Sequence, residues 1–347
     1  MGRCRRGDAH AREVRPRRGA VVLGGRRDAG DRGVPRRRAG RPVWGVRRLE
    51  GRIVKAGLTL PQGCDREFLG LDATTAWRRT IDIARRGEAA GFDSLWVYDH
   101  FQVDPPLIEA PVFEPFVELA ALAVETSRAR LGHLVMAAAY RNAALTAKMI
   151  STLDVISGGR AVLGIGAGWK EDEWIAYGYG FPDHRERLAI LADHLEIITR
   201  MLGPGRATFE GRHAHVLDAI HEPKGLQQPR IPILVGGNGP NVTWRLAARF
   251  ADELNLDAMT PDAVAAALPT IRARCEEIGR DPATLRVSVH IWGEAGAVAP
   301  GGERQERLGR YAEGGPGRTR PRRAHRRLRG RRDPRQRAGL TGARLPP

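Results

Sequence analysis

Residues Leu131 to Trp174 read LGHLVMAAAYRNAALTAKMISTLDVISGGRAVLGIGAGWKEDEW. The stretch opens with an apolar run and continues with a helical pattern that ends at Ser157-Gly158-Gly159. A second apolar run, Arg160 to Ile165, opens into the glycine-rich segment Gly164 to Trp169. A strand, an amphipathic helix and a second strand make a βαβ unit, which implies a parallel sheet. The glycines come at the carboxyl end of the second strand, where α/β folds bind ligands.

The chain on both sides of this unit continues the alternation of strand and helix. We expect strands at residues 52–60, 94–98, 131–137, 161–165, 231–235, 251–256 and 286–292. We expect helices at residues 74–90, 116–126, 142–156, 182–202, 242–250, 261–278 and 303–313. Sequential units of this kind, with right-handed crossovers, close most simply as a (β/α)8 TIM-like barrel. The long irregular insertion at residues 203–230 is typical of a functional lid or an embellishment.

The eighth strand of such a barrel should follow Glu313. Instead the chain reads Gly-Pro-Gly-Arg-Thr-Arg-Pro-Arg-Arg over residues 315–323, which is not a strand pattern. Seven strands leave two edges whose backbone donors and acceptors are unpaired. We therefore expect an α/β barrel with insertions that lacks its eighth strand as written, and a frameshift near Glu313 would explain the loss.

The net charge of +17 comes from the two ends of the chain. Residues 1–50 contain 16 arginines and 5 acidic residues, residues 301–347 contain 15 arginines and 4 acidic residues, and the four lysines all lie between them. Arginine without lysine is typical of GC-rich DNA read in a wrong frame or beyond a true start. We therefore expect residues 1–50 and 314–347 to be disordered and not native, and residues 51–313 to form the barrel. The alternative is a nucleic-acid-binding protein with two arginine-rich arms.

The cysteines and the short apolar runs of the chain indicate an enzyme of the cytoplasm. Cys4, Cys64 and Cys275 have neither metal-ligand spacing nor an obvious pairing, which fits a reducing compartment. No apolar run approaches the roughly 18 residues that a membrane span needs. We expect a cytoplasmic protein that acts on a small molecule and does not bind a membrane.

Asp99 and His100 are the best candidates for acid–base chemistry. They directly follow the apolar strand Ser94 to Tyr98, and barrel enzymes place catalytic groups at that end of a strand. A histidine can donate or accept a proton near neutral pH. A lone histidine is more often structural, but this position favours the catalytic interpretation.

Two glycine-rich turns are candidates for holding a phosphorylated cofactor. The first is Gly164 to Trp169, which does not match the dinucleotide fingerprint because Trp169 takes the position of its last glycine. The second is Gly236 to Pro240, which ends a strand and opens a helix, where backbone N–H groups favour an anion. Each turn alone is also consistent with a plain tight connection, but both are predicted at the same face of the barrel.

Other polar residues are interpreted as structural. The acidic run Glu171-Asp172-Glu173 fits a solvated helix start better than a metal site, because acidic residues favour a helix N-terminus. His213, His215 and His221 lie in the long insertion without ligand-like spacing, and we expect them on the surface. We predict no metal site.

Taken together, these residues resemble the bacterial luciferase-like family of flavin- and deazaflavin-dependent oxidoreductases. The matching segments occur in order between about residues 53 and 313, and are Gly57–Pro61, Leu95–Phe101, Tyr140–Asn142, Leu153–Arg160, Gly164–Trp169 and Pro232–Gly237. The Asp-His pair after the second strand and the Trp after the glycine turn look most like the coenzyme F420-dependent branch. The resemblance implies a TIM-like barrel with insertions and no Rossmann domain.

The resemblance further implies hydride transfer between a deazaflavin and a small organic substrate, with His100 and Asp99 at the reacting centre. The cofactor ring would lie over the third strand, where family members often carry a non-proline cis peptide, here at Leu134-Val135. The cofactor-binding residues implied are Leu134, Val135, Ala137, Ala138, Asn142, Gly164, Gly166, Gly168, Trp169, Gly236, Gly237, Asn238 and Gly239. Sugar-phosphate-oxidising members carry a carboxylate in the first glycine turn, where this chain has Trp169.

The FMN-dependent monooxygenases are the alternative within the same family. They share the barrel and receive reduced flavin from a separate reductase, which would then be a partner. The two cofactors differ chemically, since a deazaflavin has carbon in place of the flavin N5 and transfers hydride without activating oxygen readily. A homodimer is common in the family.

Overall fold

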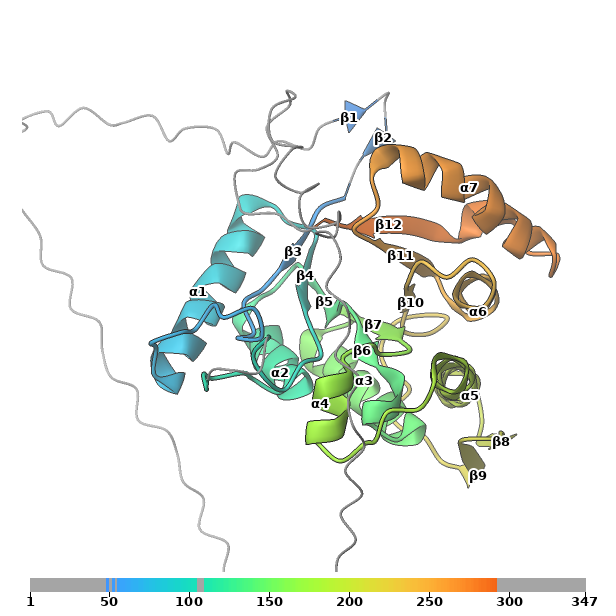
Figure 1. The fold of residues 1–347 in the computed structure, drawn as a ribbon, viewed down its shortest axis with the longest axis horizontal. Coiled ribbons are helices and arrows are strands. Elements are labelled where there is room, and N and C mark those ends of the chain that lie inside the picture. The colour runs from blue at the N-terminus through green and yellow to red at the C-terminus, as the bar shows by residue number, and fades with distance from the viewer. Residues whose placement is uncertain (1–47, 50–51, 54, 105–108, 292–347) are drawn as a thin grey trace, which may run out of the picture.

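The computed structural model describes residues 48–49, 52–53, 55–104 and 109–291 of the 347-residue chain. Within these residues a curved, mostly parallel sheet is surrounded by helices (Figure 1). Its strands are β3 (Gly57–Thr59), β4 (Ser94–Val97), β5 (Arg130–His133), β7 (Ala161–Gly166), β10 (Ile233–Gly236), β11 (Glu253–Asp257) and β12 (Arg286–His290). They lie side by side in chain order, every neighbouring pair is parallel, and β6 (Met136–Ala137) also pairs with β7.

The helices begin and end at the residues that local chemistry favours. They are α1 (Ala73–Ala90), α2 (Pro115–Glu125), α3 (Ala143–Ser157), α4 (Glu171–Ala176), α5 (His184–Leu202), α6 (Thr243–Phe250) and α7 (Pro261–Glu276). The side chains of Asp72, Asn142 and Asp183 accept hydrogen bonds from the first turns of α1, α3 and α5. Gly91 and Gly158 end α1 and α3 in the left-handed conformation that favours glycine.

The core lies between the sheet and its helices. The strands bury Leu95, Leu131, Leu163, Ile233 and Leu254 completely. Each buried side chain of this size contributes roughly 1.5–3 kcal/mol relative to full exposure. The continuous apolar runs of β7 and β10 reflect burial on both faces of a parallel sheet.

The described residues form an incomplete TIM-like barrel, as the alternation of strands and helices predicted. The strand order equals the chain order, and the sheet curls far enough to bring the Tyr98 hydroxyl, after β4, within 3.2 Å of Nε2 of His290 in β12. β3 and β12 are the two ends of the described sheet. The expected helix at 303–313, the place of the eighth strand and the arginine-rich tail at 314–347 lie outside the described residues. So does the arginine-rich segment 1–50, apart from Arg48 and Leu49, which form a short strand where disorder was expected.

Two sequence predictions need correction. The expected first strand at 52–60 is two elements, because β2 (Arg52–Ile53) pairs antiparallel with β1 (Arg48–Leu49) and β3 alone joins the sheet. The insertion at 203–230 is not irregular throughout, since it contains the antiparallel hairpin of β8 (Ala207–Glu210) and β9 (His215–Ala219). Alternate hairpin residues such as Phe209 and Val216 pack against the core, which is why the hairpin rests against α5.

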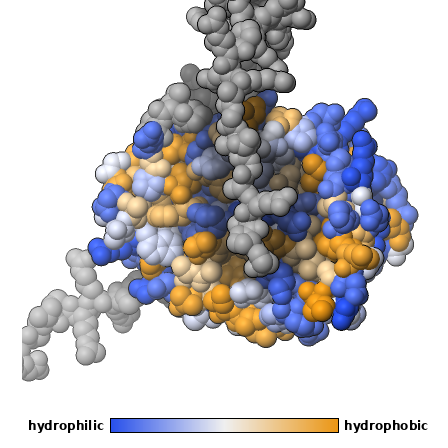
Figure 2. Space-filling model, turned by 90° about the horizontal axis from the view of Figure 1, so that it is seen from below, coloured by the Kyte–Doolittle hydropathy of each residue, from blue (hydrophilic) through white to orange (hydrophobic). Residues whose placement is uncertain are grey.

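None of the helices that the structure describes combines the length and apolar character needed to cross a bilayer. The face seen from below the view of Figure 1 carries apolar residues in several patches among polar ones (Figure 2). Val117 and Val124 of α2 are each 70% exposed, and Ile175 of α4 is 59% exposed. Surface apolar residues of this kind are common on folded proteins and do not alone mark a site.

Candidate active site

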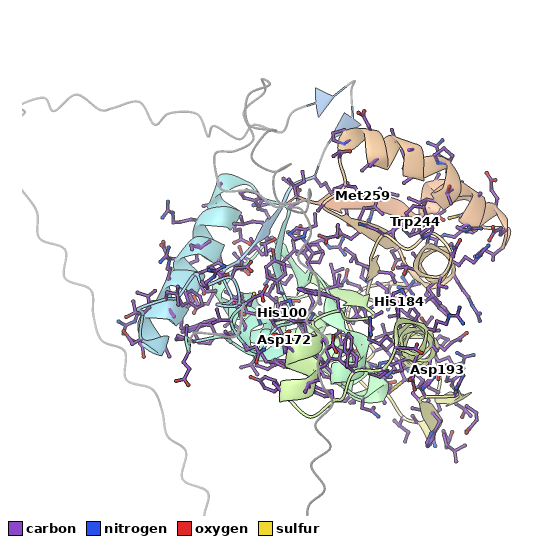
Figure 3. All side chains as sticks on the ribbon, viewed as in Figure 1. His100, Asp172, His184, Asp193, Trp244 and Met259 are labelled. Atoms are coloured by element: carbon purple, nitrogen blue, oxygen red, sulfur yellow. The ribbon has the colours of Figure 1, made fainter. Side chains whose placement is uncertain are left out.

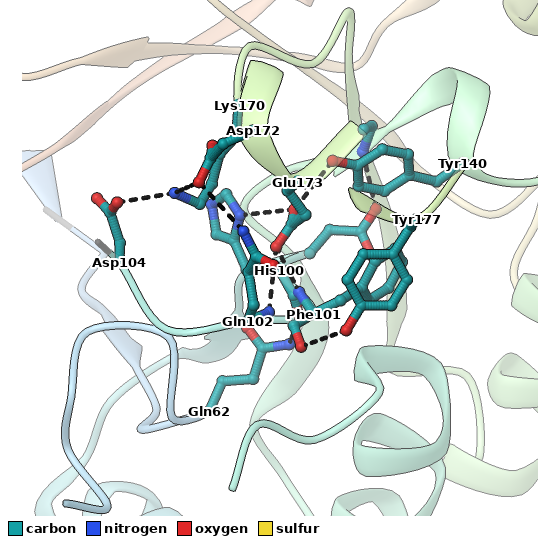
Figure 4. A network of polar contacts seen from close by, with 12 residues as sticks. Gln62, His100, Phe101, Gln102, Asp104, Tyr140, Lys170, Asp172, Glu173 and Tyr177 are labelled. Carbon is teal, nitrogen blue, oxygen red and sulfur yellow. Dashed lines mark hydrogen bonds and ion pairs between the residues drawn. The ribbon is translucent and has the colours of Figure 1, made fainter. Parts of the chain in front are cut away.

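The short connection after β4 places His100 against the short helix α4. Nδ1 of His100 lies 3.1 Å from Oε2 of Glu173, whose side chain is completely buried, whereas 19% of the His100 side chain is exposed (Figure 4). The carboxylate can only accept, so this hydrogen bond assigns the proton of a neutral His100 to Nδ1. Within the described part of the chain no hydrogen bond occupies Nε2. The imidazole therefore presents a nitrogen that can take up a proton toward the rim.

Glu173 accepts four hydrogen bonds from the residues that the structure describes. Besides His100, its carboxylate accepts from the backbone N–H of Phe101 at 2.7 Å, from that of Gln102 at 3.2 Å and from the Tyr140 hydroxyl at 2.9 Å (Figure 4). Burial alone would raise the pKa of Glu173, but the hydrogen bonds from His100, the backbone and Tyr140 lower it below its usual range. Glu173 is thus a fixed negative charge that orients His100 and would stabilise its protonated form.

Asp99 is occupied by structural contacts. Its carboxylate accepts the backbone N–H of Ala137 at 2.9 Å and forms an ion pair of 2.9 Å with Arg141. Burial raises the pKa of Asp99, and the adjacent guanidinium opposes that shift. Arg141 also reaches Glu114 at 2.6 Å, so Asp99 links the end of β4 to the segment after β6 and to the start of α2. The side chain of Asp99 therefore holds these three segments of the rim together.

Aromatic side chains surround His100 and Glu173. Trp169 meets the His100 ring edge-on with a centroid separation of 5.8 Å, and 67% of Trp169 is exposed. Beneath it, Phe101, Tyr140 and Tyr179 pack closely, and the Tyr177 hydroxyl donates to the Phe101 carbonyl at 2.9 Å. Burial and the Glu173 carboxylate raise the pKa of Tyr140, which keeps its hydroxyl a donor.

A second polar contact ties α4 to the loop after β4. Nζ of the buried Lys170 forms ion pairs with Asp104 at 2.7 Å and with Asp172 at 3.2 Å, and Gln102 donates to Asp172 at 3.1 Å (Figure 4). His100 and Asp172 lie together near the middle of the molecule (Figure 3). The acidic run at the start of α4 is therefore partly engaged rather than solvated as predicted.

The first glycine turn has a packing role that the sequence prediction did not include. All six residues of β7 are buried, and a Cβ on Gly164 would lie 1.8 Å from the carbonyl oxygen of His133. A Cβ on Gly166 or on Gly236 would lie 2.9 Å from the Val135 side chain. These glycines make room for the bulge between β5 and β6, where the Leu134-Val135 peptide is cis, as the resemblance implied.

The second glycine turn is held by its neighbours at the same rim. Asn238 donates to the Asp257 carbonyl at 2.8 Å and accepts its backbone N–H at 2.9 Å. Asp257 in turn contacts Nδ1 of His290 at 3.0 Å, and His290 reaches Tyr98 next to Asp99. A series of contacts therefore joins Asn238, through Asp257 and His290, to Tyr98, the residue before Asp99.

The predicted cofactor residues fall into three groups. Leu134, Val135, Trp169, Gly236, Gly237, Asn238 and Gly239 keep some exposure. Ala137, Ala138, Gly164 and Gly166 are buried, and a Cβ on Gly168 would meet Trp174 at 2.7 Å. Asn142 caps α3 and lines a cavity together with residues of the β8–β9 hairpin and of α5.

Two polar residues were missed or misplaced by the sequence interpretation. Glu173 was expected in solvent, yet it is the buried partner of His100. The available signal was its position four residues after Trp169, on the inner side of a short helix that also buries Trp174. His221, expected on the surface, is 1% exposed and contacts the Ser151 hydroxyl at 2.8 Å.

A family model described as luciferase-like monooxygenase matches residues 64–326. The chain therefore belongs to the luciferase-like monooxygenase family, as its motifs predicted. An F420-dependent glucose-6-phosphate dehydrogenase of Kineococcus radiotolerans is 39% identical over 179 residues, which cover 50% of each chain. The chain spans about half the length of the curated relatives it matches.

Solved structures agree with the fold. The coenzyme F420-dependent tetrahydromethanopterin reductase from Methanopyrus kandleri superposes with a TM-score of 0.56 and 26% identity, covering 68% of this chain and 65% of that one. The oxygenating constituent of 3,6-diketocamphane monooxygenase from Pseudomonas putida, in complex with FMN, superposes with a TM-score of 0.54 and 20% identity. The match covers 67% of this chain and 66% of that one. The second likeness is one of fold only.

Proposed function

We propose that this chain is an F420-dependent oxidoreductase that transfers hydride between the deazaflavin and a small organic substrate. The observation that carries the proposal is the His100–Glu173 pair, 3.1 Å apart at the carboxyl end of β4 and beside the exposed Trp169. F420-dependent relatives at up to 39% identity support the choice of cofactor.

The residues at the rim fit a flat, phosphorylated cofactor. Trp169 and the half-buried Leu134 and Val135 offer apolar surface to a planar ring. Helix α6 has Val242 at its N-cap without a side-chain cap, so backbone N–H groups after the Gly237-Asn238-Gly239 turn can take a phosphate. The bulge at Val135, which the glycines of β7 and β10 make possible, carries this apolar surface into the rim.

Each polar residue of the rim then has a defined role. A bound deazaflavin would supply hydride chemistry, through the carbon that replaces the flavin N5, at a site held by these residues. His100 moves the proton that accompanies this transfer through its Nε2, and Glu173 holds the ring and balances its positive charge. Asp99 positions the Ala137 backbone beneath the bulge.

Fluorescence titration of the full chain with F420 and with FMN tests the proposal. We expect F420 to bind at least about tenfold more tightly, which corresponds to about 1.4 kcal/mol. Tighter binding of FMN would reverse the assignment and favour a two-component monooxygenase that requires a flavin reductase. If the chain instead acts through nucleic acid, a DNA duplex should bind to it and neither cofactor should bind.

A further inference from the structure

The second glycine turn, which follows β10, is held differently at its base and at its tip. At the base, the backbone N–H of Gly237 donates to the carbonyl of Asn255 in β11 at 3.0 Å. Nε1 of Trp244 in α6 donates to the Gly237 carbonyl at 3.1 Å. The tip, Asn238, is exposed, and its side chain forms two hydrogen bonds with the backbone of Asp257. The position of the tip therefore follows that of Asp257.

Asp257, at the end of β11, is itself fixed by contacts with β12. Its side chain is 55% exposed, so packing alone does not hold it. The next residue, Ala258, has a φ of 51°, a left-handed conformation that residues other than glycine rarely adopt. The N–H of Ala258 donates to the carbonyl of His290 at 3.0 Å. This end of β11 thus keeps an unfavourable backbone conformation because surrounding contacts impose it.

The side chain of His290 provides the second contact from β12. Its Nδ1 lies 3.0 Å from Oδ1 of Asp257, and only 10% of the side chain is exposed. The carboxylate can only accept, so the proton of a neutral His290 lies on Nδ1 and Nε2 is an acceptor. Nε2 lies 3.2 Å from the Tyr98 hydroxyl. Burial raises the pKa of Tyr98, which keeps this hydroxyl a donor, so one hydrogen bond on each side fixes the imidazole.

The contact between His290 and Tyr98 joins two distant parts of the sheet. β12 is one end of the described sheet, and β4 is the neighbour of β3 at the other end (Figure 1). Tyr98 directly follows β4, and its ring centroid lies 6.3 Å from that of His100. The support of the glycine turn therefore ends on the strand that carries the proposed acid–base residue.

We propose that His290 is a positioning residue for the cofactor phosphate, because it fixes Asp257 and, through Asp257, the tip of the turn at Asn238. The inference rests on the proposed function, in which the phosphate meets backbone N–H groups after this turn. In this role His290 acts through Asp257 rather than on the phosphate itself. A turn that is ordered before binding loses less conformational entropy when the phosphate arrives, and the difference appears as affinity.

Fluorescence titration of the full chain with two deazaflavins tests this role. One is F420, and the other is the same chromophore with its ribityl chain but without the phosphate and the groups beyond it. His290→Phe keeps a flat ring and removes both side-chain hydrogen bonds. It should weaken F420 binding about fivefold or more, the scale of one side chain left unordered, and leave the phosphate-free deazaflavin within about twofold. His184→Phe, at an exposed position of α5, is the matched control and should leave both affinities within about twofold.

Two milder variants separate positioning from folding. His290→Asn keeps an N–H donor near the place of Nδ1, and Tyr98→Phe removes only the hydroxyl that contacts Nε2. Each should weaken F420 binding by about two- to threefold, because each breaks the same link and leaves the contact with Asp257. Tyr98→Phe should add nothing in the His290→Phe background, since the two side chains act through one hydrogen bond. If His290→Phe does not fold, the comparison of the two deazaflavins is made with Tyr98→Phe.

The outcomes distinguish this inference from the proposed function. An equal loss of both deazaflavins in His290→Phe indicates a merely structural role and would overturn the inference, as would unchanged binding of F420. Equal affinity of the wild type for the two deazaflavins would also overturn it, since the phosphate would then contribute nothing, while the proposed cofactor would stand. If the wild type binds neither deazaflavin, the proposed function fails and the inference fails with it.

Discussion

The rim of the barrel carries polar residues at the ends of β4 and α4, and glycines at the ends of β7 and β10. His100 and Glu173 are joined by a hydrogen bond, and the carboxylate is fully engaged by donors. Gly164, Gly166 and Gly236 instead leave room for the backbone of His133 and the side chain of Val135. The two regions therefore differ in their contacts: the proposed proton transfer belongs to the polar pair, whereas the glycines make room for the neighbouring strand. Substitutions in the two regions should separate turnover from folding.

The largest effect is expected at Gly164. A Cβ there would lie 1.8 Å from a backbone oxygen, and the neighbouring strand cannot move away without disturbing the sheet. Gly164→Ala should lower the free energy of unfolding by about 3 kcal/mol or more, measured by chemical denaturation. Gly70→Ala is the matched control, because its Cβ meets open space and only the left-handed backbone, at a cost of about 1–2 kcal/mol, opposes it. Equal losses at the two positions would contradict the packing role of Gly164.

His100→Ala should separate the two regions in the opposite way. We expect turnover of F420 with an active substrate to fall by about 100-fold or more, the usual scale for losing an acid–base group. Cofactor affinity should stay within about threefold. Folding should be little changed, because 19% of this side chain is exposed and its one side-chain hydrogen bond among the described residues is with Glu173. Unchanged turnover would remove His100 from the mechanism.

Glu173→Gln should have a smaller effect on turnover than loss of His100. The amide keeps the shape but not the negative charge that stabilises a protonated His100, so kcat should fall at least about tenfold while KM changes little. Glu173→Asp, which keeps the charge, should recover part of the rate. If both variants lose the same activity in step with their stability, Glu173 is merely structural.

The smallest effect concerns the buried histidines, which differ from His100 in having almost no exposure. Burial lowers the pKa of His194 and of His221 to about 4, from an ordinary value of 6.5. Between these values the unfolded chain binds more protons than the folded one, so stability should fall as the pH drops from 6.5 toward 4. Each of the two histidines should lower the free energy of unfolding by on the order of 1 kcal/mol over the first pH unit below 6.5. Thermal unfolding of His221→Gln against wild type should show a shallower decline, and an unchanged slope would exclude His221 as a source.

The sequence predicted the order of the strands and the position of His100, because both follow from local apolar periodicity. It did not predict the role of Glu173, since the burial of that carboxylate depends on α4 folding back over the end of β4. The glycines of β7 were visible, but their role depends on the bulge of a neighbouring strand at Val135. His215 is exposed as predicted, whereas the burial of His213 and His221 was missed because the pairing of β8 with β9 and its packing on α5 are tertiary contacts.

A crystal structure of the full chain with F420 tests the central claim most directly. We predict the deazaflavin ring against Trp169 and the bulge at Leu134-Val135, with Nε2 of His100 facing the space where a substrate would meet the ring. A ring bound elsewhere, or a His100 whose Nε2 points away from it, would contradict the proposed reaction.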